Sequence, residues 1–262
     1  MPAENTSRTP SDLQYSADAP FGLSRTGRRL LRFFKHRVGD IELLLPLYLW
    51  ATPLGTSRQL TADTELVIEG KPRSGNTFAR RAMEQAADEP TSISSHAHVP
   101  SAVVRAVRRG CPTLVLVRQP IDSICSEKIA APHASLASVI RAWIHYYEKI
   151  WPYRDGYVVA TFDQVVTDFG GVTDRLNRRF GTSFARFENS AENDDLVFGV
   201  IEQQHRAVHG DTENIVPRPS SARHDAKDEL LGRLEDPKFE QALARAAAVY
   251  RRYAERAETS QL

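Results

Sequence analysis

Short runs of aliphatic and β-branched residues alternate along the chain with segments of helical periodicity. Such runs predict buried strands, whereas apolar residues at helical spacing predict amphipathic helices. The predicted strands are 66–68, 91–98, 114–117 and 157–161, the last running into Phe162, Asp163 and Gln164. The predicted helices are 78–87, 103–109 up to Gly110, a helix from Pro120, 136–150, 172–179 up to Gly181, and 238–256, with a loop at 208–222. Alternating strands and helices predict an α/β fold: a central parallel sheet flanked by helices, with ligands bound beyond the strands' carboxyl ends.

The N-terminal region has a different pattern. Residues 1–20 are rich in Ser, Thr, Pro and Asp and predict a disordered tail, while residues 61–262 hold the α/β pattern. Between them, residues 21–60 predict a helical extension that is basic over 25–37 and apolar over 41–50. Residues 25–50 could form a membrane-surface helix and give peripheral membrane contact. The favoured interpretation is a helix packed on the domain with its basic face in solvent.

Composition narrows the class of protein. A chain of 262 residues is long enough for one substantial α/β domain. The formal net charge of +1, from 34 basic and 33 acidic residues, gives no indication of nucleic-acid binding. Cys111 and Cys125 show no metal-ligand spacing and are expected to be buried and reduced. With no secretory signal pattern and no apolar run of about 18 residues, a cytoplasmic protein is expected, possible membrane association aside.

The first candidate for chemistry follows the first strand. Gly70 and Gly75 have the spacing of a phosphate-binding loop, and Thr77 opens a helical segment. A strand, a glycine-containing loop and a helix N-terminus make an anion cradle from backbone N–H groups. The lysine that normally precedes the threonine is replaced by Asn76, and Arg73 inside the loop supplies the cation. An ordinary strand–turn–helix corner is the alternative interpretation.

The second candidate follows the third strand. In P-loop enzymes that hydrolyse nucleotides, a strand of this kind commonly ends in an aspartate that holds Mg²⁺. Here the strand ends in Arg118, which cannot hold a metal but can bind a phosphate with its planar fork of donors. Ser126 lies about two helical turns later and roughly on the same side, so its hydroxyl could bind the same anion.

Together, these segments resemble the family of sulfotransferases that use 3′-phosphoadenosine 5′-phosphosulfate (PAPS). Residues 71–77 resemble the family's 5′-phosphosulfate loop, and residues 117–126 resemble its 3′-phosphate motif, with Arg118 and Ser126 as the two binding residues. The resemblance implies a P-loop-like three-layer fold and the use of PAPS as donor without a metal ion. The loop residues that it implies for donor binding are Lys71, Arg73, Ser74, Gly75, Asn76 and Thr77.

Other roles are carried over residue by residue. Arg73 is expected to stabilise the departing phosphate, and a histidine to act as general base. His98 matches the family's local pattern of His, an apolar residue and Pro, whereas His96 lies closer to the family's usual interval from Arg118, so both stay candidates. Phe162 corresponds to an aromatic position near adenine. The family's Arg-Lys-Gly loop is absent, and Arg218 and Arg223 are the candidate substitutes over the 3′-phosphate.

The resulting hypothesis is a sulfotransferase that acts on a hydroxyl of a carbohydrate, a glycolipid or a small metabolite. Two alternatives stay open: a P-loop kinase or nucleotide-binding protein, and a non-catalytic binding protein with the same fold. The missing lysine and the missing aspartate argue against the kinase.

Overall fold

The computed structural model describes residues 60–209 and 221–259. The predicted tail (1–20), all but the last residue of the predicted extension (21–60), and Arg218 lie outside the described residues.

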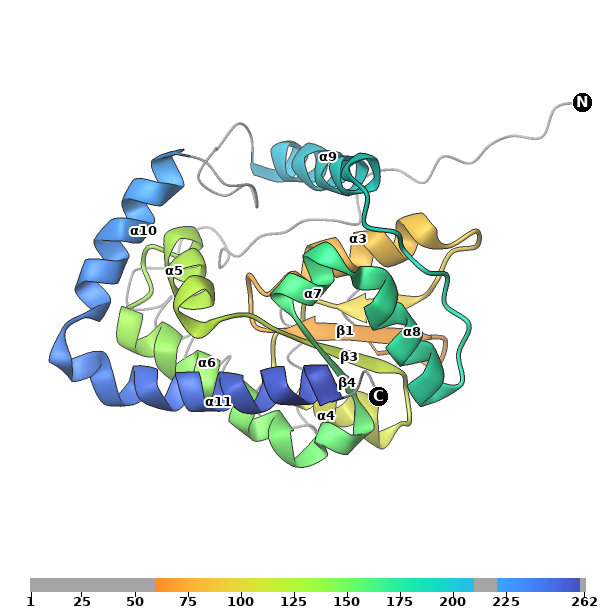
Figure 1. Cartoon of the computed structure of the whole chain (residues 1–262), viewed down its shortest axis with the longest axis horizontal. Coiled ribbons are helices and arrows are strands. Elements are labelled where there is room, and N and C mark those ends of the chain that lie inside the picture. The colour runs from red at the N-terminus through yellow and green to blue at the C-terminus, as the bar shows by residue number, and fades with distance from the viewer. Residues whose placement is uncertain (1–59, 210–220, 260–262) are drawn as a thin grey trace, which may run out of the picture.

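A parallel sheet forms the centre of the fold (Figure 1). Its strand order is β2-β1-β3-β4, and all three pairings are parallel. The strands are β1 (Leu66–Gly70), β2 (Ile93–Ser95), β3 (Thr113–Val117) and β4 (Val158–Thr161). The four predicted strands are therefore confirmed, although the second is shorter than predicted because the chain turns at His96, whose φ is 68°.

The α-helices connect and cover these strands. They are α3 (Asn76–Ala86), α4 (Pro100–Arg108), α5 (Pro120–Ala130), α6 (Leu136–Ile150), α7 (Phe162–Thr167), α8 (Phe169–Phe180), α9 (Ala191–His209), α10 (Ser221–Leu234) and α11 (Glu240–Thr259). Two 3₁₀ segments, η4 (Trp151–Gly156) and η5 (Pro237–Phe239), precede β4 and α11.

Strand side chains point alternately to two helical layers, as the two-residue period of a strand requires. Leu66 and Ile68 belong to a buried cluster with side chains of α3, α8 and α9. Val115 and Val117 belong to a second cluster, which contains side chains of α6 and α11. Because both faces are covered, the fold is the predicted three-layer α/β arrangement.

Several predicted boundaries were wrong. Phe162 does not end the fourth strand but begins α7, because Thr161 and Gln164 form a reciprocal capping box that starts a helix. The predicted loop at 208–222 is helical at both ends, in α9 and α10. Both helices went unpredicted because they bury few side chains: α10 buries Leu230 and Leu234.

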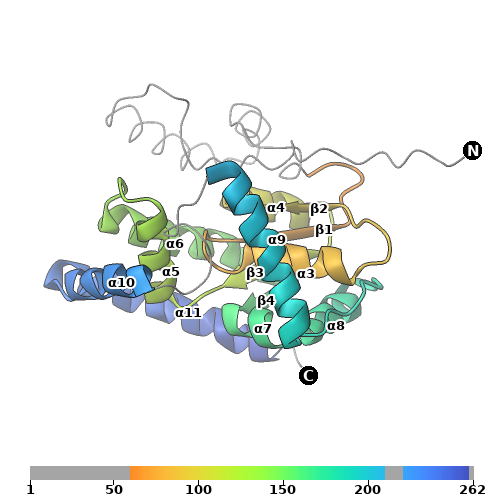
Figure 2. The ribbon, with the colours of Figure 1, turned by 90° about the horizontal axis from the view of Figure 1, so that it is seen from above.

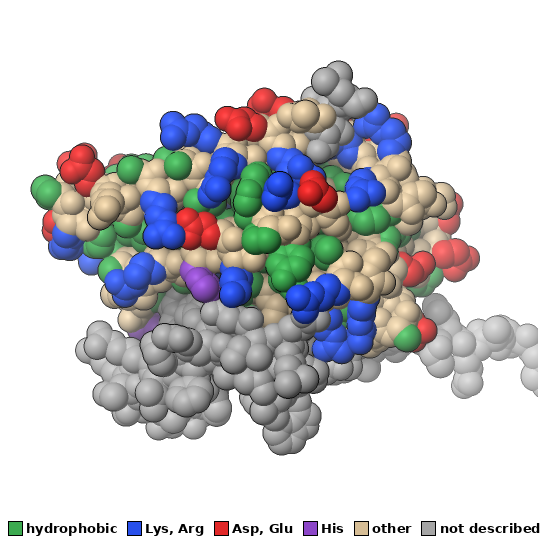
Figure 3. Space-filling view, turned by 90° about the horizontal axis from the view of Figure 1, so that it is seen from below, with side chains coloured by type: hydrophobic (Ala, Val, Ile, Leu, Met, Phe, Trp, Pro, Cys, Tyr) green, Lys and Arg blue, Asp and Glu red, His purple; other side chains and the backbone are tan. Residues whose placement is uncertain are grey.

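The outer helices are held by particular contacts. α9 packs on α3 (Figure 2), where the Arg81 guanidinium donates to Gln204 Oε1 at 2.7 Å. α10 packs on α5, with Lys227 Nζ 2.7 Å from Asp122 Oδ1. On the face seen from below, basic side chains are interspersed with acidic and apolar ones (Figure 3). Within the described ranges, no helix is both long and apolar enough to cross a lipid bilayer.

Candidate phosphate-binding site

The candidate site lies where the connections from β1 and β3 leave the sheet. β1 and β3 are neighbours in the centre of the sheet, but the chain goes from β1 to β2 on one side and later to β3 on the other. In open α/β sheets, the carboxyl ends of strands at such a reversal are the usual place for ligands to bind. The candidate phosphate-binding loop (residues 71–75) and Arg118 both follow directly from strands that end at this edge.

The loop is tight, and glycine is required at both ends. A Cβ on Gly70 would lie 2.5 Å from the Leu116 carbonyl oxygen, so β1 and β3 could not approach as closely. Gly75 has a φ of 94° as the N-cap of α3, in a region that favours glycine. The Ser74 N–H donates to the Lys71 carbonyl at 3.3 Å and closes the turn. The loop therefore brings the chain directly onto the N-terminus of an 11-residue helix.

Arg73 of the loop contacts both Arg118 and Ser126, which come from the segment after β3. Arg73 Nε donates to Ser126 Oγ at 2.9 Å, and Arg118 Nη1 donates to the Arg73 carbonyl at 3.1 Å. The Arg118 guanidinium also lies over the Phe162 ring, 4.2 Å from its centroid. An added Cβ at Gly75 would lie 3.3 Å from Phe162, so this ring also borders the loop. Four predicted site residues from separate segments are thus brought together.

Arg118 is partly removed from water. Burial lowers its pKa, while Asp122 and Asp163 act in the opposite direction. A guanidinium keeps its charge at any physiological pH even so, because its ordinary pKa is above 12. A partly desolvated positive charge attracts an anion more strongly than one in bulk water does.

Lys71 is placed differently from the other predicted donor-binding residues. Its side chain is 3% exposed and its ammonium lies 3.6 Å from a Glu127 carboxylate oxygen. Its backbone N–H donates to the Tyr147 hydroxyl at 3.3 Å, and its carbonyl accepts from Asn76 Nδ2 at 3.0 Å. The structure thus places the Lys71 side chain in a buried ion pair beneath the loop.

Tyr147 of α6 contacts the loop from the neighbouring helical layer. Its hydroxyl donates to the Leu116 carbonyl at 2.7 Å and lies 3.4 Å from Ser74 Oγ. Burial raises the pKa of Tyr147, so the phenol stays protonated. One side chain of α6 therefore joins β3 to the phosphate-binding loop. The apolar stripe that predicts α6 hides this role, because Tyr147 occupies an ordinary core position in that stripe.

The two histidines differ in how their rings are held. Both ring nitrogens of His96 face hydroxyl groups: Nδ1 lies 2.6 Å from Ser95 Oγ and Nε2 lies 3.1 Å from Thr77 Oγ1. His98 Nδ1 lies 2.7 Å from the Gly70 carbonyl. Since a carbonyl only accepts, Nδ1 of His98 must donate, and the neutral ring carries its lone pair on Nε2. This tautomer suits a general base at Nε2.

Glu69 is a site residue that sequence reasoning missed. It is fully buried, and its carboxylate accepts hydrogen bonds from two consecutive backbone N–H groups, those of Ala97 at 2.7 Å and His98 at 3.0 Å. The sequence feature that could have indicated this role is the position of Glu69, an acidic residue within an otherwise apolar run that predicts a buried strand. Of the remaining predicted residues, Arg223 lies in α10, and Arg218 lies outside the described residues.

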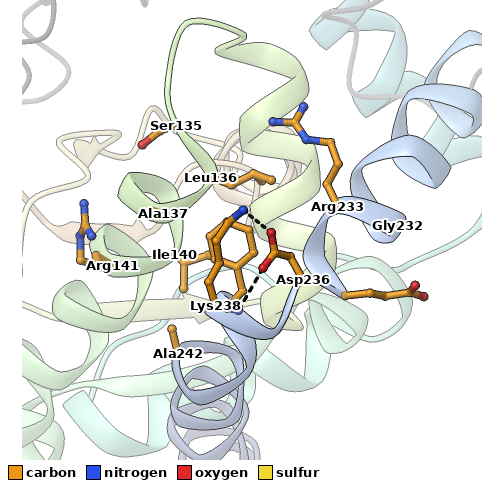
Figure 4. A pocket seen from close by; sticks show the side chains of 12 residues that line it. Ser135, Leu136, Ala137, Ile140, Arg141, Gly232, Arg233, Asp236, Lys238 and Ala242 are labelled. Carbon is orange, nitrogen blue, oxygen red and sulfur yellow. Dashed lines mark hydrogen bonds and ion pairs between the residues drawn. The ribbon is translucent and has the colours of Figure 1, made fainter.

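A separate pocket of about 980 Å³ lies between the first turns of α6, the end of α10 and the start of α11 (Figure 4). Leu136, Ile140 and Phe239 form its apolar lining, and Arg141, Arg233 and Lys238 are among its polar residues. Lys238 is paired with Asp236. Of the predicted site residues whose side chains the structure describes, none lines this pocket.

The comparisons with known proteins found similarity among solved structures alone. No family model matches the chain, and no curated protein matches it. Among solved structures, the chain is similar to mouse sulfotransferase SULT7A1 complexed with PAP. The identity is 11%, the TM-score is 0.40, and the match covers 70% of this chain and 89% of the mouse chain. At this distance the function has to be argued from the chain's own residues.

Proposed function

We propose that the protein is a sulfotransferase that transfers a sulfuryl group from PAPS to a hydroxyl of a carbohydrate, a glycolipid or a small metabolite. The observation that carries the proposal is that Arg73, Arg118 and Ser126 lie together beside the loop. Arg73 donates a hydrogen bond to Ser126, and Arg118 donates one to the Arg73 carbonyl. Two guanidinium groups and a hydroxyl match the phosphates of a doubly phosphorylated adenosine. Arg118 follows β3 at the position where a magnesium-dependent P-loop nucleotidase commonly has the aspartate that binds Mg²⁺.

The residues fit the proposed donor at both ends. The loop N–H groups and the N-terminus of α3 present positive potential to a 5′-phosphate. Arg118 and Ser126 lie on the neighbouring segment and suit a 3′-phosphate, while Phe162 offers a ring for the adenine. A bound donor supplies a sulfur that is already electrophilic. The protein therefore has to align the reactants and neutralise the charge on the leaving phosphate.

His98 is the proposed general base. Nε2 of the neutral ring takes the proton of the acceptor hydroxyl as the hydroxyl oxygen bonds to sulfur and the bond from sulfur to the phosphate oxygen breaks. Arg73 stabilises the negative charge that develops on that phosphate oxygen. His96 serves as a positioning residue, because its ring faces the Thr77 hydroxyl at the start of α3.

Calorimetry with the purified full-length chain tests this function. Adenosine 3′,5′-bisphosphate without metal is compared with ATP plus Mg²⁺. The proposal expects tight binding of the bisphosphate and weak binding of the triphosphate; the opposite order would favour a P-loop kinase. Labelled-sulfate transfer from PAPS to a panel of acceptors, lost in Arg73→Ala, separates an enzyme from a non-catalytic binding protein. Arg141→Ala, which removes an exposed arginine on α6 outside the site, is the control.

A further inference from the structure

The turn at residues 96–98 contains two residues in a backbone conformation that residues with a side chain rarely adopt. His96 has a φ of 68° and His98 a φ of 54°, both in the left-handed region that favours glycine. Arg73 is the remaining residue of this kind in the described part of the chain, so all of them lie at the candidate site. Such conformations persist only where surrounding contacts enforce them. The contacts that enforce this turn therefore decide where the His98 ring lies.

Glu69 supplies two of those contacts. It is the fourth residue of β1 and is fully buried. One carboxylate oxygen accepts from the Ala97 N–H at 2.7 Å, and the other accepts from the His98 N–H at 3.0 Å. Hydrogen bonds to a charged acceptor are stronger than those between neutral groups, and a buried carboxylate needs them. Both oxygens are thus engaged by successive residues of the turn.

The next residue of the same strand holds the ring. The Gly70 carbonyl accepts from His98 Nδ1 at 2.7 Å. Adjacent residues of β1 therefore hold the backbone of His98 through a side chain and its imidazole through a carbonyl. β1 is a central strand, paired with β2 and β3, so the support is rigid. A rotation of the His98 backbone would break the ring contact as well, since the Cβ position would move with it.

We infer that Glu69 is a positioning residue that holds the 96–98 turn in its left-handed conformation and thereby keeps the His98 lone pair on Nε2. The inference rests on the proposed function, in which that nitrogen accepts the acceptor's proton. Because the Glu69 side chain is fully buried, it acts on the reaction through the turn and not by touching the acceptor. A merely structural carboxylate would affect the melting temperature without affecting the His98 ring.

The test compares Glu69→Gln with the wild-type full-length protein labelled with ¹⁵N-histidine. The substituted side chain would keep one acceptor oxygen and present an amide to the other N–H, so the turn loses one of its two bonds. The signals of His98 are assigned with a His98→Gln variant. In the wild type, we expect the His98 ring to be the Nδ1–H tautomer. In Glu69→Gln, we expect the His98 ring to be a mixture of the two tautomers. Sulfuryl transfer should fall by about tenfold or more in kcat. The Kd for adenosine 3′,5′-bisphosphate should change much less than kcat does, because Glu69 binds the N–H groups of Ala97 and His98 and not that of His96.

Glu65→Gln is the matched control. Glu65 precedes the other end of β1, and its Oε2 accepts from the Ser92 N–H at 2.7 Å. This variant should leave the His98 ring and kcat as in the wild type. An unchanged His98 tautomer and an unchanged kcat in Glu69→Gln would overturn the inference. If Glu69→Gln does not fold, hydrogen exchange of the backbone amides is measured in the wild type instead. Slow exchange of the Ala97 and His98 amides would support the inference, and unprotected amides would overturn it.

The ring measurement needs neither donor nor acceptor. If the wild-type protein does not bind the bisphosphate, the proposed function is contradicted. The tautomer measurement on His98 would still be valid. The two failures are distinguishable for this reason.

Discussion

Arg118 donates a hydrogen bond to the backbone carbonyl of Arg73, at 3.1 Å, so the cation that follows β3 is attached to the loop that follows β1. Residues 45 positions apart in the sequence thus form one unit. A carbonyl next to the guanidinium disperses part of its charge, and the Phe162 ring covers one face of it. The arrangement keeps the Arg118 side chain beside the loop before any anion arrives.

Removing the Arg118 guanidinium should weaken binding of the bisphosphate. A hydrogen bond to a charged group contributes about 1.5–3 kcal/mol, so Arg118→Ala should raise the Kd by about tenfold or more. Calorimetry measures this directly. Arg141→Ala should bind as the wild type does. An unchanged Kd in Arg118→Ala would show that the 3′-phosphate is bound elsewhere.

The two histidines should respond differently. His98→Ala removes the proposed base and should lower kcat by about 10²-fold or more while the Kd for the bisphosphate stays close to wild type. His96→Ala removes the ring that faces Thr77 Oγ1 and should raise that Kd instead. Single-turnover kinetics and calorimetry on both variants separate the effects. Equal and small losses in kcat would place the base on another residue.

Gly75 should tolerate no side chain. Gly75→Ala forces an L-residue to a φ of 94° and places its Cβ 3.3 Å from Phe162, so both stability and bisphosphate affinity should fall. Gly110→Ala is the matched control: its φ of 67° is also left-handed, but no atom lies within 4 Å of the added Cβ. Each should cost about 1–2 kcal/mol of backbone strain, seen in denaturant melts. Equal affinities in the two variants would contradict the contact between loop and ring.

The buried pair of Lys71 and Glu127 should act in stability rather than in donor binding. Removing one partner leaves an uncompensated buried charge, and Lys71→Met should lower the free energy of unfolding by about 3–5 kcal/mol. The double variant Lys71→Met with Glu127→Leu should recover much of that loss. A double-mutant cycle by urea denaturation measures the coupling. Weak bisphosphate binding in a stable double variant would instead restore Lys71 as a donor-binding residue.

Both cysteines should be unreactive thiols in the native protein. Burial raises the pKa of Cys111 from 9.0 to about 11, against an opposing effect of Arg109, and burial likewise raises the pKa of Cys125 to about 11. The folded state then holds its protons more tightly than the unfolded state does between pH 9 and 11. Stability should therefore fall as pH rises through that window. Urea melts from about pH 8 to 11 and thiol titration with and without denaturant check both statements.

The sequence predicted the sheet well because each strand is a continuous buried run between two helical layers. It predicted α6 to the residue, since core side chains recur at helical spacing along it. It did not predict α9 and α10, whose few buried side chains leave no such stripe. It also placed Arg73, Arg118 and Ser126 at one edge of the sheet, because parallel strands bring their carboxyl ends together, but it did not predict the hydrogen bond from Arg73 to Ser126.

The details of the site depended on tertiary contacts that no local pattern contains. The left-handed turn at His96 and His98 is held by Glu69, 28 and 29 residues away from the N–H groups that it binds. Local propensity favours an extended chain there, and the sequence accordingly predicted a strand up to His98. Tyr147 joins the loop from 76 residues away. Such long-range bonds also separate the roles of the two histidines.

The last described helix completes the layer behind the loop. Tyr253 of α11 donates to the carbonyl of Tyr147 at 2.7 Å, and Ala246, Val249 and Ala257 join the same buried cluster. The two tyrosines are 106 residues apart in the sequence. During synthesis, this face therefore cannot close until the residues of α11 have left the ribosome. Until then, the growing chain exposes an unfinished apolar layer to chaperones and to other nascent chains.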